Sequence, residues 1–212
     1  DTRKEQSYVL FPLTQEQLAH ALFPRGEFTK VEVREMAVEM NLKTKDKPES
    51  QEICFVTGKR YSDLIAEKAG SQIGTGLLKD TGGKFLGNHD GIHNFTIGQR
   101  KGLGVAFEKP RYVIDIDPVQ NTVTIGIAEE LFKDVFTVGE VNWITIESLE
   151  TELRSCVKIR YQNNESPATI YPLEQNRVRV KFDQPQRAIA PGQAAVFYDG
   201  DIIMGGGWIE RG

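Results

Sequence analysis

The sequence has little cysteine and no long apolar run, and both shortages narrow the class of protein that it encodes. Its two cysteines, Cys54 and Cys156, lie far apart and form no disulfide framework, so we expect a protein of a reducing compartment, the cytoplasm. No window approaches the roughly 18 consecutive apolar residues of a membrane helix, and residues 1–6 lack the apolar stretch of a signal peptide. We therefore expect a soluble globular protein without membrane contact.

Methionine is missing from position 1, which leads us to expect a piece of a longer polypeptide. The 212 residues suffice for one large domain or two small ones. A net charge of -4 argues against indiscriminate coating of nucleic acid. The charge is unevenly distributed, however, because residues 154–187 hold seven basic and three acidic side chains, a local charge of +4.

The N-terminal part has the pattern of two short amphipathic helices. Residues 14–17 and 29–32 each have the form of a capping box ahead of apolar residues at helical spacing, and Asn41 is a reasonable stop for the second helix. Two such helices have too little surface between them to form a core. We expect their apolar stripes to be loosely attached or to be buried by self-association of the chain.

Glycine and β-favouring residues dominate the rest of the sequence. Residues 111–116 and 122–127 flank a turn sequence, Asp117-Pro118-Val119-Gln120-Asn121, and predict a β-hairpin. Regularly spaced strands predict a small barrel or sandwich at the C-terminal end. These strands are expected near residues 138–146, 154–161, 168–171, 177–182, 194–198 and 202–208.

Period-two alternation predicts that two of these strands each have a basic face. Residues Arg154, Cys156, Lys158 and Arg160 point away from the apolar side of one strand, and Arg177, Arg179 and Lys181 do so in another. Such faces bind phosphates or simply keep a barrel exterior solvated. Tyr161, next to Arg160, favours RNA slightly, because an aromatic beside a cation can stack on an unpaired base.

Cys54 is the candidate sulfur nucleophile. Four basic residues lie near it in the sequence (Lys45, Lys47, Lys59 and Arg60), and an electropositive, partly exposed setting makes a thiolate reactive. The alternative is a small apolar core residue, because Ile53, Phe55 and Val56 surround it.

Two other motifs leave several interpretations open. His89-Asp90-Gly91-Ile92-His93 offers metal ligands or the base of a thiol hydrolase, but the Asn88 and Gly91 positions indicate a turn, and we predict no metal site. The segment 96–104, Thr-Ile-Gly-Gln-Arg-Lys-Gly-Leu-Gly, lacks the ending of a Walker loop. It is a basic loop that approaches an RNA backbone or closes over Cys54, or else a plain turn.

Seven segments together resemble the tRNA-specific 2-thiouridylases, the MnmA family. The most specific are Ser-Gln-Glu-Ile-Cys-Phe at 50–55 and the 96–104 segment. The others are residues 4–8, 11–13, 141–144, 158–161 and 190–198, and the matches follow the family's order along the whole chain. The family's Ser-Gly-Gly-x-Asp-Ser loop, which binds ATP, and its second catalytic cysteine are absent from the sequence. The resemblance therefore implies the C-terminal three-fifths of the enzyme.

The resemblance also implies roles for individual residues. Cys54 would carry a persulfide whose sulfur goes to C2 of the wobble uridine, U34, after ATP-dependent adenylation elsewhere in the enzyme. The implied tRNA contacts are Lys4, Glu5, Gln6, Arg160, Tyr161 and Gln193. The implied partners are tRNA and a sulfur-donor protein, either a desulfurase or a relay protein. The competing interpretation is a non-enzymatic β-barrel that binds RNA and in which Cys54 is structural.

The expected fold is mostly β with an N-terminal helical segment, a central β-rich domain and a small C-terminal β-barrel. We expect a helical remnant of the adenylating domain at residues 1–56, the central domain at 57–137 and the tRNA-binding barrel at 138–212.

Overall fold

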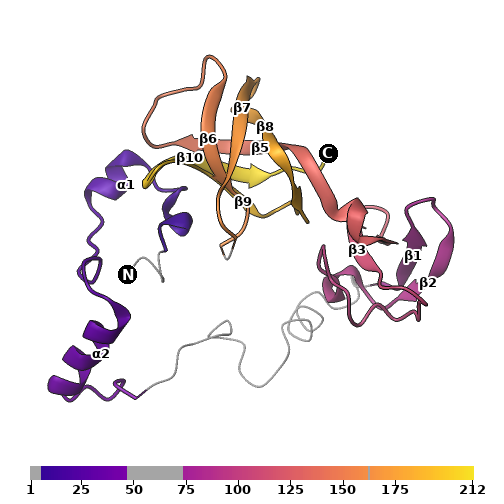
Figure 1. The fold of residues 1–212 in the computed structure, drawn as a ribbon, viewed down its shortest axis with the longest axis horizontal. Coiled ribbons are helices and arrows are strands. Elements are labelled where there is room, and N and C mark those ends of the chain that lie inside the picture. The colour runs from indigo at the N-terminus through magenta and orange to yellow at the C-terminus, as the bar shows by residue number, and fades with distance from the viewer. Residues whose placement is uncertain (1–5, 47–73, 162) are drawn as a thin grey trace.

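The computed structural model describes residues 6–46, 74–161 and 163–212 (Figure 1). It is mostly β, with short helices at the N-terminal end, a central sheet and a closed C-terminal barrel, which confirms the expected fold class. None of the helices in these ranges has the length and apolarity that a membrane crossing requires.

The N-terminal elements are a 3-10 helix η2 (Ser7–Leu10) and the helices α1 (Gln15–Ala19) and α2 (Lys30–Glu39). Both predicted capping boxes are present, because the Thr14 and Thr29 side chains accept from the backbone N–H groups of Gln17 and Glu32. Asn41 has φ +49°, the left-handed conformation that ends a helix. Neither α1 nor α2 has a buried residue, and α2 lies apart from the sheet and the barrel (Figure 1).

The central sheet has the strand order β2-β1-β4-β3. Its strands are β1 (Gly76–Asp80), β2 (Phe85–His89), β3 (Tyr112–Asp117) and β4 (Thr122–Gly126), with the 3-10 helices η4 (Ile92–Asn94) and η5 (Ala128–Leu131) beside them. Strands β3 and β4 pair antiparallel, which confirms the predicted hairpin. Leu78, Val113 and Val123 form the centre of a small core, and Leu103 from the 96–104 loop packs into it.

The barrel closes in the order β10-β5-β8-β7-β6-β9, with antiparallel pairing throughout. Its strands are β5 (Phe132–Trp143), β6 (Leu153–Lys158), β7 (Ser166–Leu173), β8 (Arg177–Arg187), β9 (Ala194–Asp199) and β10 (Ile202–Ile209). The closed sheet is a barrel and not a sandwich, which were the two predicted architectures, and closure leaves no edge strand unpaired. Fourteen buried residues, the fully buried Phe197 among them, fill the interior.

Two strand predictions were wrong in their limits. The strand expected at residues 177–182 continues to Arg187. The strand expected at residues 138–146 begins at Phe132 and ends at Trp143. Its first four residues are exposed, so no alternation of apolar and polar side chains marked them as a strand. They pair instead with the end of β8, and Ile144 beyond the strand donates to the Met204 carbonyl.

Candidate nucleic-acid interface

The N-terminal segment, residues 6–13, packs on the outer face of the barrel. The Tyr8 hydroxyl donates to the Ala194 carbonyl at 2.8 Å, and Asn142 Nδ2 donates to the carbonyls of Phe11 and Leu13 at 2.7 and 3.0 Å. Tyr8 and Phe11 are both buried in this contact. The Phe11 ring fits because residue 206 is glycine, where a Cβ would lie only 2.8 Å from that ring. The barrel thus fixes the position of the chain that follows Gln6.

The buried Tyr8 is the centre of an aromatic and basic cluster that we call the Tyr8 cluster: Tyr8, Lys158, Arg160 and Tyr161. The Lys158 ammonium lies 5.8 Å from the Tyr8 ring centroid and 5.9 Å from that of Tyr161. The two tyrosine rings are 6.3 Å apart and tilted. Tyr161 is 42% exposed, so its ring is available to a ligand in a way that the Tyr8 ring is not.

Arg160 adds a half-buried charge to this cluster. Its Nη2 donates to the Ala188 carbonyl at 2.7 Å. Burial, followed by repulsion from Arg187, lowers the pKa of the Arg160 guanidinium, although an arginine remains charged at any physiological pH. Burial also raises the pKa of Tyr8 to about 12, so this phenol is neutral. The cluster therefore combines cations with aromatic faces and contains no acid, which suits an anion that carries flat bases.

Four of the predicted tRNA-contacting residues lie within the described part of the chain. Two belong to the Tyr8 cluster, and the other two lie close in the chain to residues of the Tyr8–Ala194 contact. Gln6 is exposed two residues before Tyr8, and Arg160 and Tyr161 belong to the Tyr8 cluster. Gln193 is exposed directly before Ala194, whose carbonyl binds the Tyr8 hydroxyl. Lys4, Glu5 and Cys54 lie outside the described residues.

The predicted basic faces are only partly available. Their alternation is confirmed, because Ser155, Val157, Val178 and Val180 point inward. Two of the cations are neutralised, however: Arg154 forms two bonds of 2.8 Å with Asp183, and Arg177 bonds Glu210. These pairs join different strands, so the spacing along one strand could not reveal them.

Five cations of residues 154–187 form no ion pair within the described ranges: Lys158, Arg160, Arg179, Lys181 and Arg187. Arg187 lies over the Tyr112 ring at 5.3 Å from its centroid, so it joins the barrel to the central sheet.

Sequence reasoning missed Tyr8 and Arg187 as site residues. Tyr8 belongs to one of the segments that carry the resemblance, and Arg187 is the last basic residue of the region 154–187. Neither fact indicates that the two residues lie near Arg160 in the folded chain.

One histidine of the 89–93 motif, His89, serves the local backbone. His89 is buried, and its Nδ1 accepts from the Gly91 N–H at 3.0 Å while its ring lies against Phe95. Burial lowers the pKa of His89. In the ranges that the structure describes, no three potential ligands come together to hold a metal ion. Cys156, the second cysteine, is half-buried beside Tyr198 on the outer face of the barrel.

Comparison with known families accounts for nearly the whole chain. Residues 1–58 match the tRNA methyl transferase HUP domain, residues 62–127 the tRNA methyl transferase PRC-barrel domain and residues 133–209 the aminomethyltransferase beta-barrel domain. This succession of domains is that of a tRNA-modifying protein.

Curated relatives narrow the class further. The chain is 54% identical over its full length to tRNA-specific 2-thiouridylase MnmA 1 of Thermoanaerobacter sp. (strain X514). It is 50% identical over 98% of its length to MnmA of Acetivibrio thermocellus and 48% over 99% to MnmA of Clostridioides difficile. The chain belongs to the MnmA family of tRNA-specific 2-thiouridylases. It spans 58% of the length of these relatives.

Proposed function

We propose that this chain is the tRNA-binding and sulfur-carrying part of a tRNA-specific 2-thiouridylase. The observation that carries the proposal is the cluster that Arg160 and Tyr161 form with Tyr8 on the outer face of the barrel. Gln6 and Gln193 are exposed close to it in the chain, since Gln193 precedes the Ala194 that binds the Tyr8 hydroxyl. Residues that are distant in the sequence share this surface. Its cations would bind the backbone of the tRNA, and the exposed Tyr161 ring would stack on an unpaired base. Lys4 and Glu5 immediately precede Gln6, so we propose that they extend the same surface.

We propose Cys54 as the persulfide carrier. A sulfur-donor protein, a desulfurase or a relay protein, would leave a second sulfur on its thiolate. That terminal sulfur would attack C2 of an adenylated U34, and the C2–O bond would break as AMP leaves with the oxygen. A second thiol would then attack Cys54 Sγ, so that the S–S bond breaks, sulfur stays on the uridine and a disulfide forms. The wobble base has to leave its stack to reach this sulfur.

Adenylation requires ATP, and we assign no nucleotide site to this chain. The sequence contains no Ser-Gly-Gly-x-Asp-Ser loop, and the glycine-rich segment 96–104 lacks the residues of a Walker loop. ATP binding therefore belongs to the remainder of the enzyme. The chain's own residues would hold the tRNA, orient it and carry the sulfur.

Sulfur transfer is tested with the complete polypeptide that the gene encodes, supplied with ATP, tRNA, cysteine and a desulfurase. The readout is 2-thiouridine, seen as retardation of the tRNA in a mercury-containing gel. Cys54→Ser should abolish the product, whereas Cys156→Ser, the matched control at the other cysteine, should keep it. Product formation by Cys54→Ser would overturn the assignment of the sulfur carrier.

Alkylation of the folded chain separates this proposal from the non-enzymatic RNA-binding barrel. A sulfur carrier at Cys54 should react with iodoacetamide before the chain unfolds and should take up sulfur from the desulfurase. A structural core cysteine would stay inert until unfolding. Mass spectrometry of the peptide that contains Cys54 gives the answer, with the half-buried Cys156 as the internal reference.

A further inference from the structure

A second basic site lies in the central domain and shares no residue with the Tyr8 cluster. It is a hollow of about 330 Å³ whose charged lining consists of Arg100, Glu108, Lys109 and Arg111. We call it the central hollow. Three cations face one acid there, and the side chains of these three cations form no hydrogen bond or ion pair within the described ranges. Cations without an internal partner around an open hollow favour an anionic ligand.

The loop that forms one side of the hollow is held in place before any ligand binds. Gln99 ties it on both sides, because its Oε1 accepts from Thr96 N–H and its Nε2 donates to the Lys101 carbonyl, each at 2.9 Å. The loop backbone also pairs with Val113 of β3, and Leu103 is buried in the core of the sheet. A loop fixed in this way presents Arg100 without a large entropic cost on binding.

The central hollow adjoins the barrel surface. At Gly98 the loop comes so close to the barrel that a Cβ there would lie 3.3 Å from the Ala188 Cβ. Ala188 also accepts the hydrogen bond from Arg160. On the other side of the hollow, Tyr112 follows Arg111 and its ring lies beneath Arg187. Arg187 lies at this junction, because its Nη1 is 3.9 Å from the Cβ position at Gly98 and its charge acts on Arg160 of the Tyr8 cluster.

We propose that the central hollow binds backbone phosphates of the same RNA that the Tyr8 cluster binds. The RNA backbone, rather than a nucleotide, is the ligand that cations spread over two domains fit, because each phosphate along a strand can meet a different cation. This proposal rests on the proposed function. It also assigns the 96–104 loop to an RNA contact, one of the interpretations that its sequence left open.

The test measures binding of a tRNA transcript to the 212-residue chain between 50 and 200 mM salt. Each phosphate contact contributes about 0.7–0.9 to the slope of log Kobs against log salt. The triple variant Arg100→Gln, Lys109→Gln, Arg111→Gln should lower the slope by about 2–3 and weaken binding about tenfold or more at 100 mM salt. Arg100→Lys with Arg111→Lys, which keeps both charges, should retain the slope. Thermal melting of each variant reports whether it is folded.

The matched control is Lys84→Gln, since Lys84 is an exposed cation of the same domain that does not line the hollow. It should bind as the wild type does, whereas Arg100→Gln alone should lower the slope. An unchanged slope in a folded triple variant, or hollow cations that respond to inorganic phosphate but not to RNA, would overturn the proposal. A wild-type chain that binds no tRNA would contradict the proposed function instead. If Tyr161→Ala loses binding and the triple variant does not, the proposed function is supported and the proposal for the hollow is overturned.

Discussion

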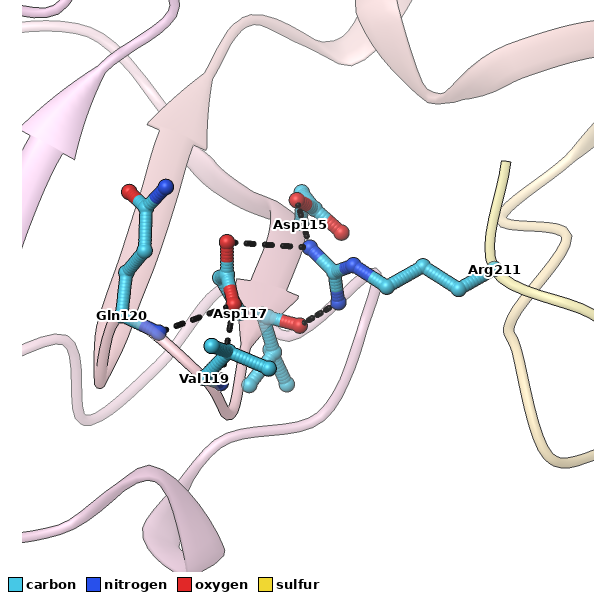
Figure 2. Close-up of polar contacts among 6 residues, drawn as sticks. Asp115, Asp117, Val119, Gln120 and Arg211 are labelled. Atoms are coloured by element: carbon cyan, nitrogen blue, oxygen red, sulfur yellow. Dashed lines mark hydrogen bonds and ion pairs between the residues drawn. The ribbon is translucent and has the colours of Figure 1, made fainter.

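The Arg211 guanidinium joins the barrel to the central sheet through Asp115 (Figure 2). Its Nη2 lies 2.7 Å from Asp115 Oδ2 and 3.8 Å from Asp117 Oδ2, while Nη1 donates to the Ile116 carbonyl. Arg211 follows the last barrel strand, whereas Asp115 and Asp117 belong to β3. Together with Arg187 over Tyr112, this contact gives the two domains a second point of attachment besides the chain between β4 and β5.

Replacing Arg211 should loosen this attachment without unfolding either domain. The pair is partly exposed, so we expect Arg211→Ala to cost about 0.5–1 kcal/mol of stability. Because the Ile116 carbonyl also loses its partner, amide exchange near the end of β3 should become faster. Arg154→Ala breaks a comparable exposed pair, with Asp183, on the outer surface of the barrel and serves as the control. Equal amide exchange rates at β3 in the Arg211→Ala and Arg154→Ala variants would contradict a role of Arg211 between the domains.

The turn at Asp117 should weaken in acid. Its Oδ1 accepts from the N–H groups of Gln120 and Val119, and these bonds, with Arg211 and Lys79, hold the Asp117 pKa below its ordinary 3.8. A lowered folded-state pKa means that the stabilisation is complete above about pH 4 and is lost as the pH falls through the folded-state pKa. The Tm should therefore fall less between pH 6 and pH 3 in Asp117→Asn than in the wild type. The same fall in both proteins would contradict this origin of the acid sensitivity.

Local sequence signals predicted the elements of this fold well. The capping boxes at Thr14 and Thr29 and the Asp117 turn each depend on residues within four positions of one another, so the sequence shows them directly. The alternation in β6 and β8 likewise separated inward from outward side chains. The start of β5 was missed because its first residues are exposed on both faces and pair with the distant end of β8.

The resemblance proposes members of the candidate site, and their arrangement is seen only in the structure. Resemblance named Arg160 and Tyr161, but only the structure shows that they lie beside Tyr8. The ion pairs of Arg154 and Arg177 could not be read from a strand pattern either, since their partners come from other strands. A count of charges in residues 154–187 therefore overstates the cations that are free to meet RNA.

Tyr161 should contribute to RNA affinity through its ring. Stacking of one base on an aromatic is worth about 1–3 kcal/mol, so Tyr161→Ala should raise the Kd for tRNA roughly 5- to 150-fold. Tyr161→Phe keeps the ring and should bind nearly as well as the wild type. Tyr171→Ala is the matched control, because this tyrosine also lies on the outer face of the barrel, beneath Arg179. Equal losses in the Tyr161→Ala and Tyr171→Ala variants would speak against a specific stacking site.

Helix α2 leaves apolar side chains uncovered, and we expect them to control association of the chain. Val31, Val38 and Met40 are 58%, 56% and 68% exposed. Covering exposed apolar surface lowers the free energy by about 25 cal/mol per Å² of surface removed from water. At high concentration the chain should therefore self-associate through α2, and at low concentration α2 should be loosely attached. Sedimentation over a range of concentrations measures the first, and amide exchange over residues 15–40 the second.

A double substitution tests whether α2 is responsible for this association. Val31→Glu with Val38→Lys should abolish the concentration dependence, because a charged side chain resists burial in an apolar contact. The matched control, Glu35→Gln with Glu39→Gln, alters exposed positions of the same helix and adds no charge, so association should persist.

Thr29→Ala tests the helix itself, because it removes the capping hydroxyl of α2. The loss should destabilise α2 by about 1 kcal/mol and lower the helix signal in far-UV circular dichroism. A monomer at every concentration with strong exchange protection across residues 15–40 would contradict both self-association and loose attachment, because the helices would then be stable without any cover for their apolar side chains.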